Sequence, residues 1–283
     1  ATLTALANTY ANGEFPAGDA ERAARESLQM WQQNTRGQSV GLANAWMVLS
    51  LGLNAAGKSD EALDAAKTAL AMLERLRAPD GRRFAALNNL GMISSRRGDH
   101  DAAKKHYRSV IDGERQAGLA ETGSFAIHLN NYATALERNS ELVESIATQR
   151  AAVQLAARLY GETGGNTIAY RGNLARKLTA HGDYVEARTM LTRVLEDSTR
   201  IHGAASAEVF NAELQIANVY SQLGQFELAA PLYRQVFNQR RAAFAGDDPR
   251  VLRAATLLAR ALVQVPGGIQ EARGLLPAFI TAA

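Results

Sequence analysis

Apolar and small residues recur along this chain with a period of 42 residues. Stretches that begin at Leu87, Leu129, Arg171 and Glu213 align without gaps, each starting 42 residues after the one before. A large residue precedes a small one in Leu49-Ser50, Leu90-Gly91, Tyr132-Ala133, Leu174-Ala175, Ile216-Ala217 and Leu258-Ala259. Another apolar residue stands four places after most of the large ones, a spacing that places both on one helix face. The pattern therefore predicts a helix in each period.

A turn and a second helix are predicted in each period. Gly98 and Gly182 come after the first helix, and each precedes an Asp. Gly ends a helix in the left-handed conformation, and the polar residue after it can cap the next helix. The second helix then carries Ala three places after an aromatic residue, as in Tyr184 with Ala187. We expect one array over residues 1–283, with approximate units 1–40, 41–81, 82–122, 123–164, 165–205, 206–247 and 248–283.

This pattern resembles the tetratricopeptide repeat, and its period resembles the variant found in kinesin light chain and its bacterial relatives. The resemblance implies an all-α, right-handed α-solenoid of about seven antiparallel helix pairs, whose inner wall is lined by the first helices. Two groups of residues depart from the repeat. Arg171 and Glu213 stand where a large apolar residue is usual, and Ser140 with Ser145 weakens one repeat. These changes predict either looser packing or contact points.

Composition narrows the classes of partner and site. Lys and Arg number 31 against 28 Asp and Glu, a net charge of +3, so no nucleic-acid partner is expected. The chain has no Cys, which removes disulfides, thiol nucleophiles and Cys-ligated zinc. No apolar run approaches the roughly 20 residues that span a bilayer. The chain starts without Met or signal-peptide features, so we interpret it as a fragment or processed product, either cytoplasmic or periplasmic if a membrane segment precedes it.

Asparagines mark the expected inner wall. Their offset from the small residue of the first helix selects Asn44, Asn88, Asn89, Asn130, Asn131, Asn173, Asn211 and Asn218. A primary amide offers two donors and an acceptor, so it can bind the backbone of an extended peptide whatever the peptide's side chains. The resemblance implies the same role, because tetratricopeptide proteins bind peptide backbone with Asn at these places. The alternative is that some of these amides bond a neighbouring helix.

Arginines also fall on or near the wall, at Arg96, Arg138, Arg176, Arg253 and Arg260. Arg138, Arg176 and Arg260 complete the predicted peptide site. Because Arg is suited to carboxylates, an acidic segment or a free carboxy terminus would fit the wall. The alternative is a solvated surface with ion pairs inside each helix. The chaperone-binding subset of the family needs paired Lys and Asn at set positions, and the absence of Lys there excludes that function.

Catalytic and metal-binding patterns are missing from the sequence. The five histidines are His100, His106, His128, His181 and His202; the last two share unit 165–205 but are far apart in it, and only the first two are close in sequence. Those two are six residues apart, not the three or four that place two ligands on one helix face. The glycines of residues 161–165 lack the Lys-Ser/Thr of a phosphate loop. We therefore expect no enzyme activity, no metal and no cofactor in this chain.

The sequence favours a scaffold that binds protein or peptide, as the interaction or sensory module of a larger bacterial signalling protein such as a Ser/Thr kinase. Two alternatives stay open. One is a receptor for a small ligand or signalling peptide. The other is a structural module that forms a homodimer through its C-terminal unit, because the expected last helix, residues 273–280, is apolar on both sides.

Overall fold

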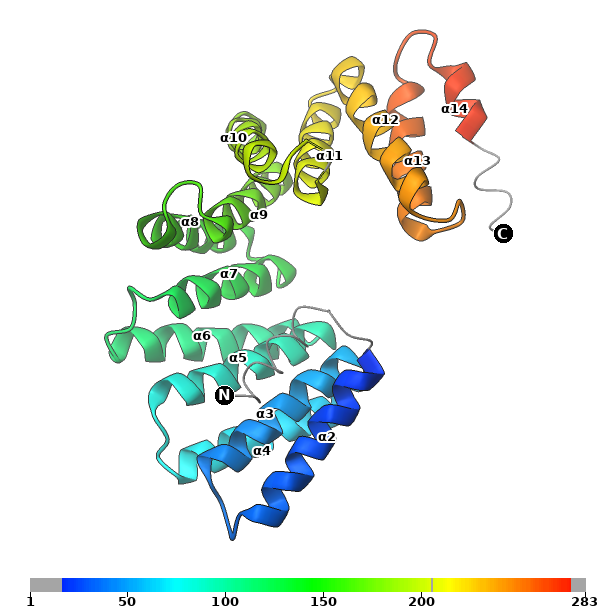
Figure 1. Ribbon diagram of the computed structural model, residues 1–283. Coiled ribbons are helices and arrows are strands. Elements are labelled where there is room, and N and C mark those ends of the chain that lie inside the picture. Colours follow the sequence, from blue (N-terminus) through cyan, green and yellow to red (C-terminus); the bar gives the residue numbers. More distant parts are fainter. Residues whose placement is uncertain (1–16, 205, 276–283) are drawn as a thin grey trace. The chain divides into compact units, whose positions relative to one another are not determined.

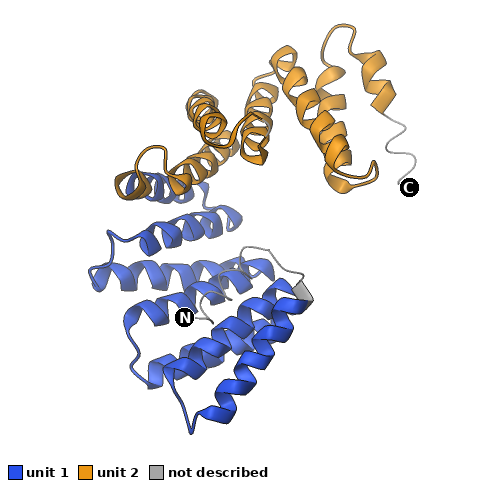
Figure 2. Ribbon diagram, viewed as in Figure 1, with its two compact units in different colours: residues 1–155 blue, residues 156–283 orange. Residues whose placement is uncertain are grey.

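The computed structural model describes residues 17–204 and 206–275, and all regular structure in these residues is helical. The all-α expectation is confirmed for this part of the chain. Two compact units divide it, residues 1–155 and 156–283 (Figure 2). The expected first helix of unit 1–40 and most of the expected last helix fall in residues 1–16 and 276–283, outside the described residues. The seven-unit division of the array stays a prediction.

The first unit consists of helices that run back and forth (Figure 1). They are α2 (Ala17–Asn34), α3 (Val40–Ala55), α4 (Ser59–Arg75), α5 (Asp80–Arg96), α6 (His100–Gln116), α7 (Gly123–Arg138) and the greater part of α8 (Leu142–Tyr160). From α2 to α7 each helix packs on the next, and α3 also contacts α5, which in turn contacts α7. The first helices of successive pairs therefore form one wall, as the repeat pattern predicts.

The second unit repeats this arrangement. Its helices are α9 (Gly165–His181), α10 (Tyr184–His202), α11 (Ala207–Gln222), α12 (Phe226–Ala243), α13 (Pro249–Leu262) and α14 (Ile269–Leu275). Neighbouring helices pack in chain order, and α9 also contacts α11. The last helix begins directly after Gly268, which is where the sequence period slips by one residue. The homodimer contact expected of residues 273–280 falls largely outside the described residues.

The turns have the expected backbone. Gly98, Gly182 and Gly224 have φ values of 82°, 100° and 70°, in the left-handed region that favours glycine. Asp99 caps α6 by accepting from the backbone N–H of Ala102 at 3.0 Å. Ser140 occupies the same place in its repeat with φ 64°, a conformation that costs a non-glycine residue about 1 kcal/mol. The turn of this repeat is therefore strained at the position where other repeats place glycine.

The core is built on the large–small pairs. Leu90, Tyr132, Leu174 and Leu258 are buried, and the small residue after each one is buried or half-buried. The Cα of Gly91 lies so close to the Tyr107 ring that an added Cβ would stand 2.8 Å from it. Close approach of α5 and α6 thus depends on the absence of a side chain at the small position.

Candidate functional site

Side-chain amides connect the wall helices of the first unit. The Asn131 Nδ2 on α7 donates to the Asn88 Oδ1 on α5 at 3.0 Å. The Asn130 Nδ2 lies 3.4 Å from the Asn131 Oδ1, and the Gln149 Nε2 on α8 donates to the Asn130 Oδ1 at 3.1 Å. The Asn88 Nδ2 contacts only a weak acceptor, the Met92 sulfur, at 3.9 Å. The structure therefore brings three of the predicted asparagines into one amide ladder across two helix pairs.

A hollow of about 400 Å³ lies beside this ladder. Its walls are Met92, Ser95, Arg96, Tyr107, Asn131, Thr134 and Arg138. No acidic side chain lines it, whereas two guanidinium groups do. Burial raises the pKa of the Tyr107 phenol, so this hydroxyl keeps its proton at neutral pH and can donate to a ligand. The hollow offers amide, hydroxyl and guanidinium donors, which suit carbonyl and carboxylate oxygens.

Two arginines connect successive wall helices at their carboxyl ends. The Arg138 Nη1 donates to the Ser95 Oγ at 2.6 Å and approaches the Ser95 carbonyl at 3.4 Å. Arg96 makes the equivalent bond one repeat earlier, to the Asn54 carbonyl. Each guanidinium thus bonds one of the carbonyls that a helix end leaves without a helical partner. These contacts hold both guanidiniums at the edge of the hollow.

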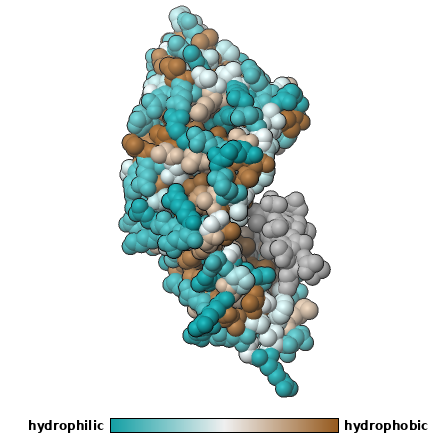
Figure 3. Space-filling model, turned by 90° about the vertical axis from the view of Figure 1, so that its left-hand side faces the viewer, coloured by the Kyte–Doolittle hydropathy of each residue, from teal (hydrophilic) through white to brown (hydrophobic). Residues whose placement is uncertain are grey.

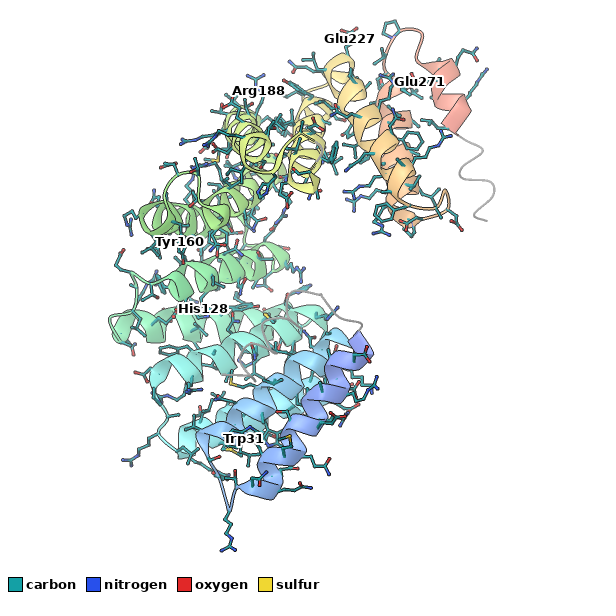
Figure 4. The ribbon with its side chains drawn as sticks, in the orientation of Figure 1. Trp31, His128, Tyr160, Arg188, Glu227 and Glu271 are labelled. Carbon is teal, nitrogen blue, oxygen red and sulfur yellow. The ribbon has the colours of Figure 1, made fainter. Side chains whose placement is uncertain are left out.

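Contacts between α6 and α7 fix the position of the ladder. His128 lies between these two helices (Figure 4), and its Nδ1 is 2.8 Å from the Glu114 Oε2. Both side chains are buried. Ser145 on α8 donates to the Ala133 carbonyl at 2.6 Å, which gives α7 a second fixed neighbour. The Ser that interrupts the repeat pattern is therefore satisfied rather than loosely packed.

The remaining predicted residues have varied surroundings. Asn44, Asn173 and Asn218 are half-buried, Asn89 is buried, and Arg176, Asn211 and Arg260 are exposed. The Asn218 Oδ1 accepts from the Tyr233 hydroxyl on α12 at 2.8 Å. This bond to a neighbouring helix is the alternative that the sequence left open for the amides.

Sequence reasoning missed several residues of the hollow and of the amide ladder. Met92 and Thr134 stand at the same place in the period as Arg176, Asn218 and Arg260, so the offset that selected those three could have found them. Tyr107 and Gln149 come from second helices, which the search for wall residues left out. Their reach toward the wall depends on how the helices pack, and no sequence period reports that.

The described residues give no support to a metal site or a membrane-spanning helix. Residues 17–204 and 206–275 contain no group of three His, Asp or Glu side chains that could hold a metal ion. Over the same residues, every helix is too short or too polar to cross a membrane. The face drawn in Figure 3 shows apolar side chains in small groups among hydrophilic ones. The amide ladder and the hollow beside it are thus the arrangement most suited to binding.

Comparison with known proteins agrees with this architecture. The family model of the tetratricopeptide repeat matches residues 42–116, 124–199 and 208–276. The chain belongs to the tetratricopeptide repeat family. The tetratricopeptide solenoid expected from the 42-residue period is therefore confirmed, and this fold is typically a non-catalytic scaffold. No curated protein sequence matches the chain.

Solved structures of tetratricopeptide proteins have the same fold. The nearly identical repeats of a kinesin light chain of Podosopora anserina align with a TM-score of 0.61 at 22% identity, over 71% of this chain and 94% of that one. The apo form of RapI gives 0.74 at 12% identity, over 99% and 74% of the two chains. NprR in complex with its cognate peptide NprX gives 0.66 at 15% identity, over 99% and 77%. At these identities the likeness shows the fold.

Proposed function

We propose that this chain is an interaction module that binds an extended peptide along the wall formed by α5 and α7. The observation that carries the proposal is the amide ladder of Asn88, Asn130 and Asn131 beside a hollow without acidic groups. Two of its contacts are weak, the 3.4 Å amide pair and the bond to sulfur. A peptide carbonyl or N–H would replace such partners at little cost and gain a stronger bond.

The charges favour an acidic peptide. Arg96 and Arg138 bond backbone carbonyls and a hydroxyl, which leave their positive charge without a counterion in the hollow. A carboxylate on the bound peptide would supply that counterion, and a charge-assisted hydrogen bond to a guanidinium is stronger than one between neutral groups. In a larger protein, such a module would act as the interaction or sensory part, for example linked to a signalling kinase.

The test is a binding measurement on peptides selected from an unbiased displayed library. We expect Asn131→Ala to weaken the selected peptides by about tenfold, or about 1.4 kcal/mol, in isothermal titration calorimetry. Asn238→Ala is the matched control, since Asn238 is exposed on the second helix α12 and does not line the hollow. A library that yields no binder, or equal affinity for wild type and Asn131→Ala, would contradict the proposal.

A signalling-peptide receptor is the second candidate. The likeness that favours it is NprR, whose structure holds its cognate peptide. The two functions differ in the consequence of binding. A receptor changes conformation when it binds, so small-angle scattering should show a smaller radius of gyration with peptide, whereas a scaffold should keep its dimensions.

A further inference from the structure

A buried tyrosine faces the hollow beside the amide ladder. Tyr107 on α6 is 4% exposed, and its side chain lines this hollow. Within residues 17–204 and 206–275, the Tyr107 hydroxyl has no hydrogen-bond partner. Polar groups on side chains this deeply buried usually bond another part of the protein or an ordered water. An open hydroxyl in the wall of a hollow therefore indicates a place for a ligand.

The equivalent tyrosine of the second unit shows which partner is missing. Tyr233 stands three periods of 42 residues after Tyr107, and it is 3% exposed. Its hydroxyl donates to the Asn218 Oδ1 at 2.8 Å. Met92 stands three periods before Asn218, so the first unit has a thioether, a weak acceptor, where the second has an amide. Methionine at this place therefore leaves the Tyr107 hydroxyl open to the hollow.

Two arginines add positive charge to the same hollow. Arg96 and Arg138 line it, and each uses only its Nη1 atom in a contact with the protein, to the Asn54 carbonyl and to Ser95. In the part of the chain that the structure describes, their Nε and Nη2 atoms have no partner, and neither guanidinium forms an ion pair. Burial raises the pKa of the Tyr107 phenol, and the charge of Arg138 opposes this shift, so these two groups lie near each other.

We propose that this hollow binds a phosphorylated side chain of the partner peptide, with the phosphoryl oxygens at Arg96, Arg138 and the Tyr107 hydroxyl. A phosphoserine carries a charge of about −1.5 to −2 and three acceptor oxygens, which match two guanidiniums and one hydroxyl. A carboxylate has one charge and two oxygens, so it would neutralise only half of the positive charge.

The inference rests on the proposed function, because the peptide would lie on the same wall of α5 and α7. It adds a means of regulation to that function. A kinase that modifies the partner would strengthen its binding to this chain, and a phosphatase would reverse the effect.

The test compares phosphorylated and unphosphorylated forms of the same peptides. Peptides are selected on the full chain from a random library with a central phosphoserine, and from a second library with serine at that place. Each selected phosphopeptide is then measured by fluorescence polarisation with phosphoserine, Ser or Glu at the central position. We expect the phosphoserine form to bind about tenfold more tightly than the serine form, with the Glu form between them.

Single substitutions test the three donors. Tyr107→Phe keeps the ring beside α5 and removes only the hydroxyl, so it should reduce the preference for phosphoserine about threefold. Tyr132→Phe is its control, because Tyr132 bonds Glu144 and does not line this hollow. Arg96→Gln and Arg138→Gln should each remove most of the preference. Arg108→Gln is their control, since Arg108 is exposed on α6 and does not line the hollow.

Three results would overturn the inference. The first is equal affinity for the phosphoserine form and for the Ser or Glu form. The second is that Tyr107→Phe and Tyr132→Phe leave the same preference for phosphoserine. The third is that inorganic phosphate binds as tightly as the phosphopeptide, which would make the ligand a free anion rather than part of a peptide.

Asn131→Ala distinguishes this inference from the proposed function. It should weaken the phosphoserine and serine forms by the same factor, because the Asn131 Nδ2 already bonds Asn88. A phosphoserine preference in peptides that do not respond to Asn131→Ala would contradict the backbone clamp alone. Peptides that respond to Asn131→Ala but bind equally well without the phosphoryl group would contradict this inference alone.

Discussion

At the scale of single residues, two charged side chains stand at repeat positions that are usually apolar, and both are buried. Arg171 and Glu213 are 5% and 9% exposed, although each stands at a position that is Leu in earlier repeats. The Arg171 Nη2 donates to the Glu162 Oε2 at 2.6 Å, and its Nη1 lies 3.5 Å from the Asp197 Oδ2. Burying a charge is costly unless it is paired, and these contacts offset that cost.

Glu213 is less well compensated and makes stability depend on pH. Its Oε1 accepts from the Gln235 Nε2 at 2.9 Å, while the Oε2 is buried without a hydrogen-bond partner. Burial raises the pKa of this carboxyl above its ordinary 4.5. The folded chain therefore holds a proton that the unfolded chain releases, and stability falls as pH rises from 4.5 through the raised pKa.

Replacing Glu213 with Gln should remove this dependence. We expect Glu213→Gln to have a higher urea midpoint than wild type at neutral pH, because the amide carries no charge to desolvate. The gap should close below pH 4.5, where the wild-type carboxyl is protonated in both states. Glu208→Gln, exposed on the same helix, is the control and should show no such pH dependence. A gap that stays constant with pH would contradict this explanation.

At the scale of helices, the distance between partners depends on the small residue of each first helix. Gly91 leaves no room for a methyl group beside Tyr107, whereas the nearest atom to a Cβ built on Gly172 is 4.0 Å away. The two glycines lie in equivalent first helices, α5 and α9. Replacing each of them with alanine therefore distinguishes the free-energy cost of close packing from the intrinsic cost of glycine in a helix.

Alanine at these two glycines should change stability in opposite directions. Gly91→Ala must displace the Tyr107 ring, and overpacking of this kind costs about 1–3 kcal/mol. Gly172→Ala adds helix propensity without a clash and should stabilise by up to about 1 kcal/mol. Urea unfolding monitored by circular dichroism measures both. Equal effects of the two changes would show that helix propensity, and not packing, decides.

Most helix positions could be predicted from the sequence because the apolar period, the glycine of the turn and the capping polar residue indicate the same helix boundaries. The left-handed turns at Gly98, Gly182 and Gly224 result from the preference of glycine for positive φ. The contacts of the candidate site could not be predicted. Gln149 and Tyr107 approach the wall from second helices, and the period alone does not give the distances between helices. The buried polarity of Arg171 was visible in the sequence, but its partner Asp197 is 26 residues away.

At the scale of the whole chain, the helices from α2 to α7 and from α9 to α14 pack mainly on those next to them in sequence. The stability of such an array is approximately a sum of repeat and nearest-neighbour terms. The chain also divides into two compact units. Damage in one repeat should therefore spread to its neighbours and weaken with distance along the chain.

Leu258→Ala tests this local behaviour. Leu258 is 1% exposed in α13, and Leu→Ala in a core costs about 2–5 kcal/mol. Hydrogen exchange should show faster amide exchange in α11 to α14, while α3 to α5 keep their protection. Leu53→Ala, in α3 and equally buried, is the reciprocal control. Loss of protection in all helices at once would indicate a single cooperative unit instead.

The bonds from Arg96 to Asn54 and from Arg138 to Ser95 have a consequence for how such a chain grows. The period of residues 82–122 carries both a donor, Arg96, that reaches the first helix of the period before it, and an acceptor, Ser95, for Arg138 of the period after it. A tandem copy of this period, inserted between the two arginines, would carry with it both the guanidinium donor and the acceptor that connect successive wall helices. Gene duplication could therefore lengthen the array in a single step, with every junction already complementary.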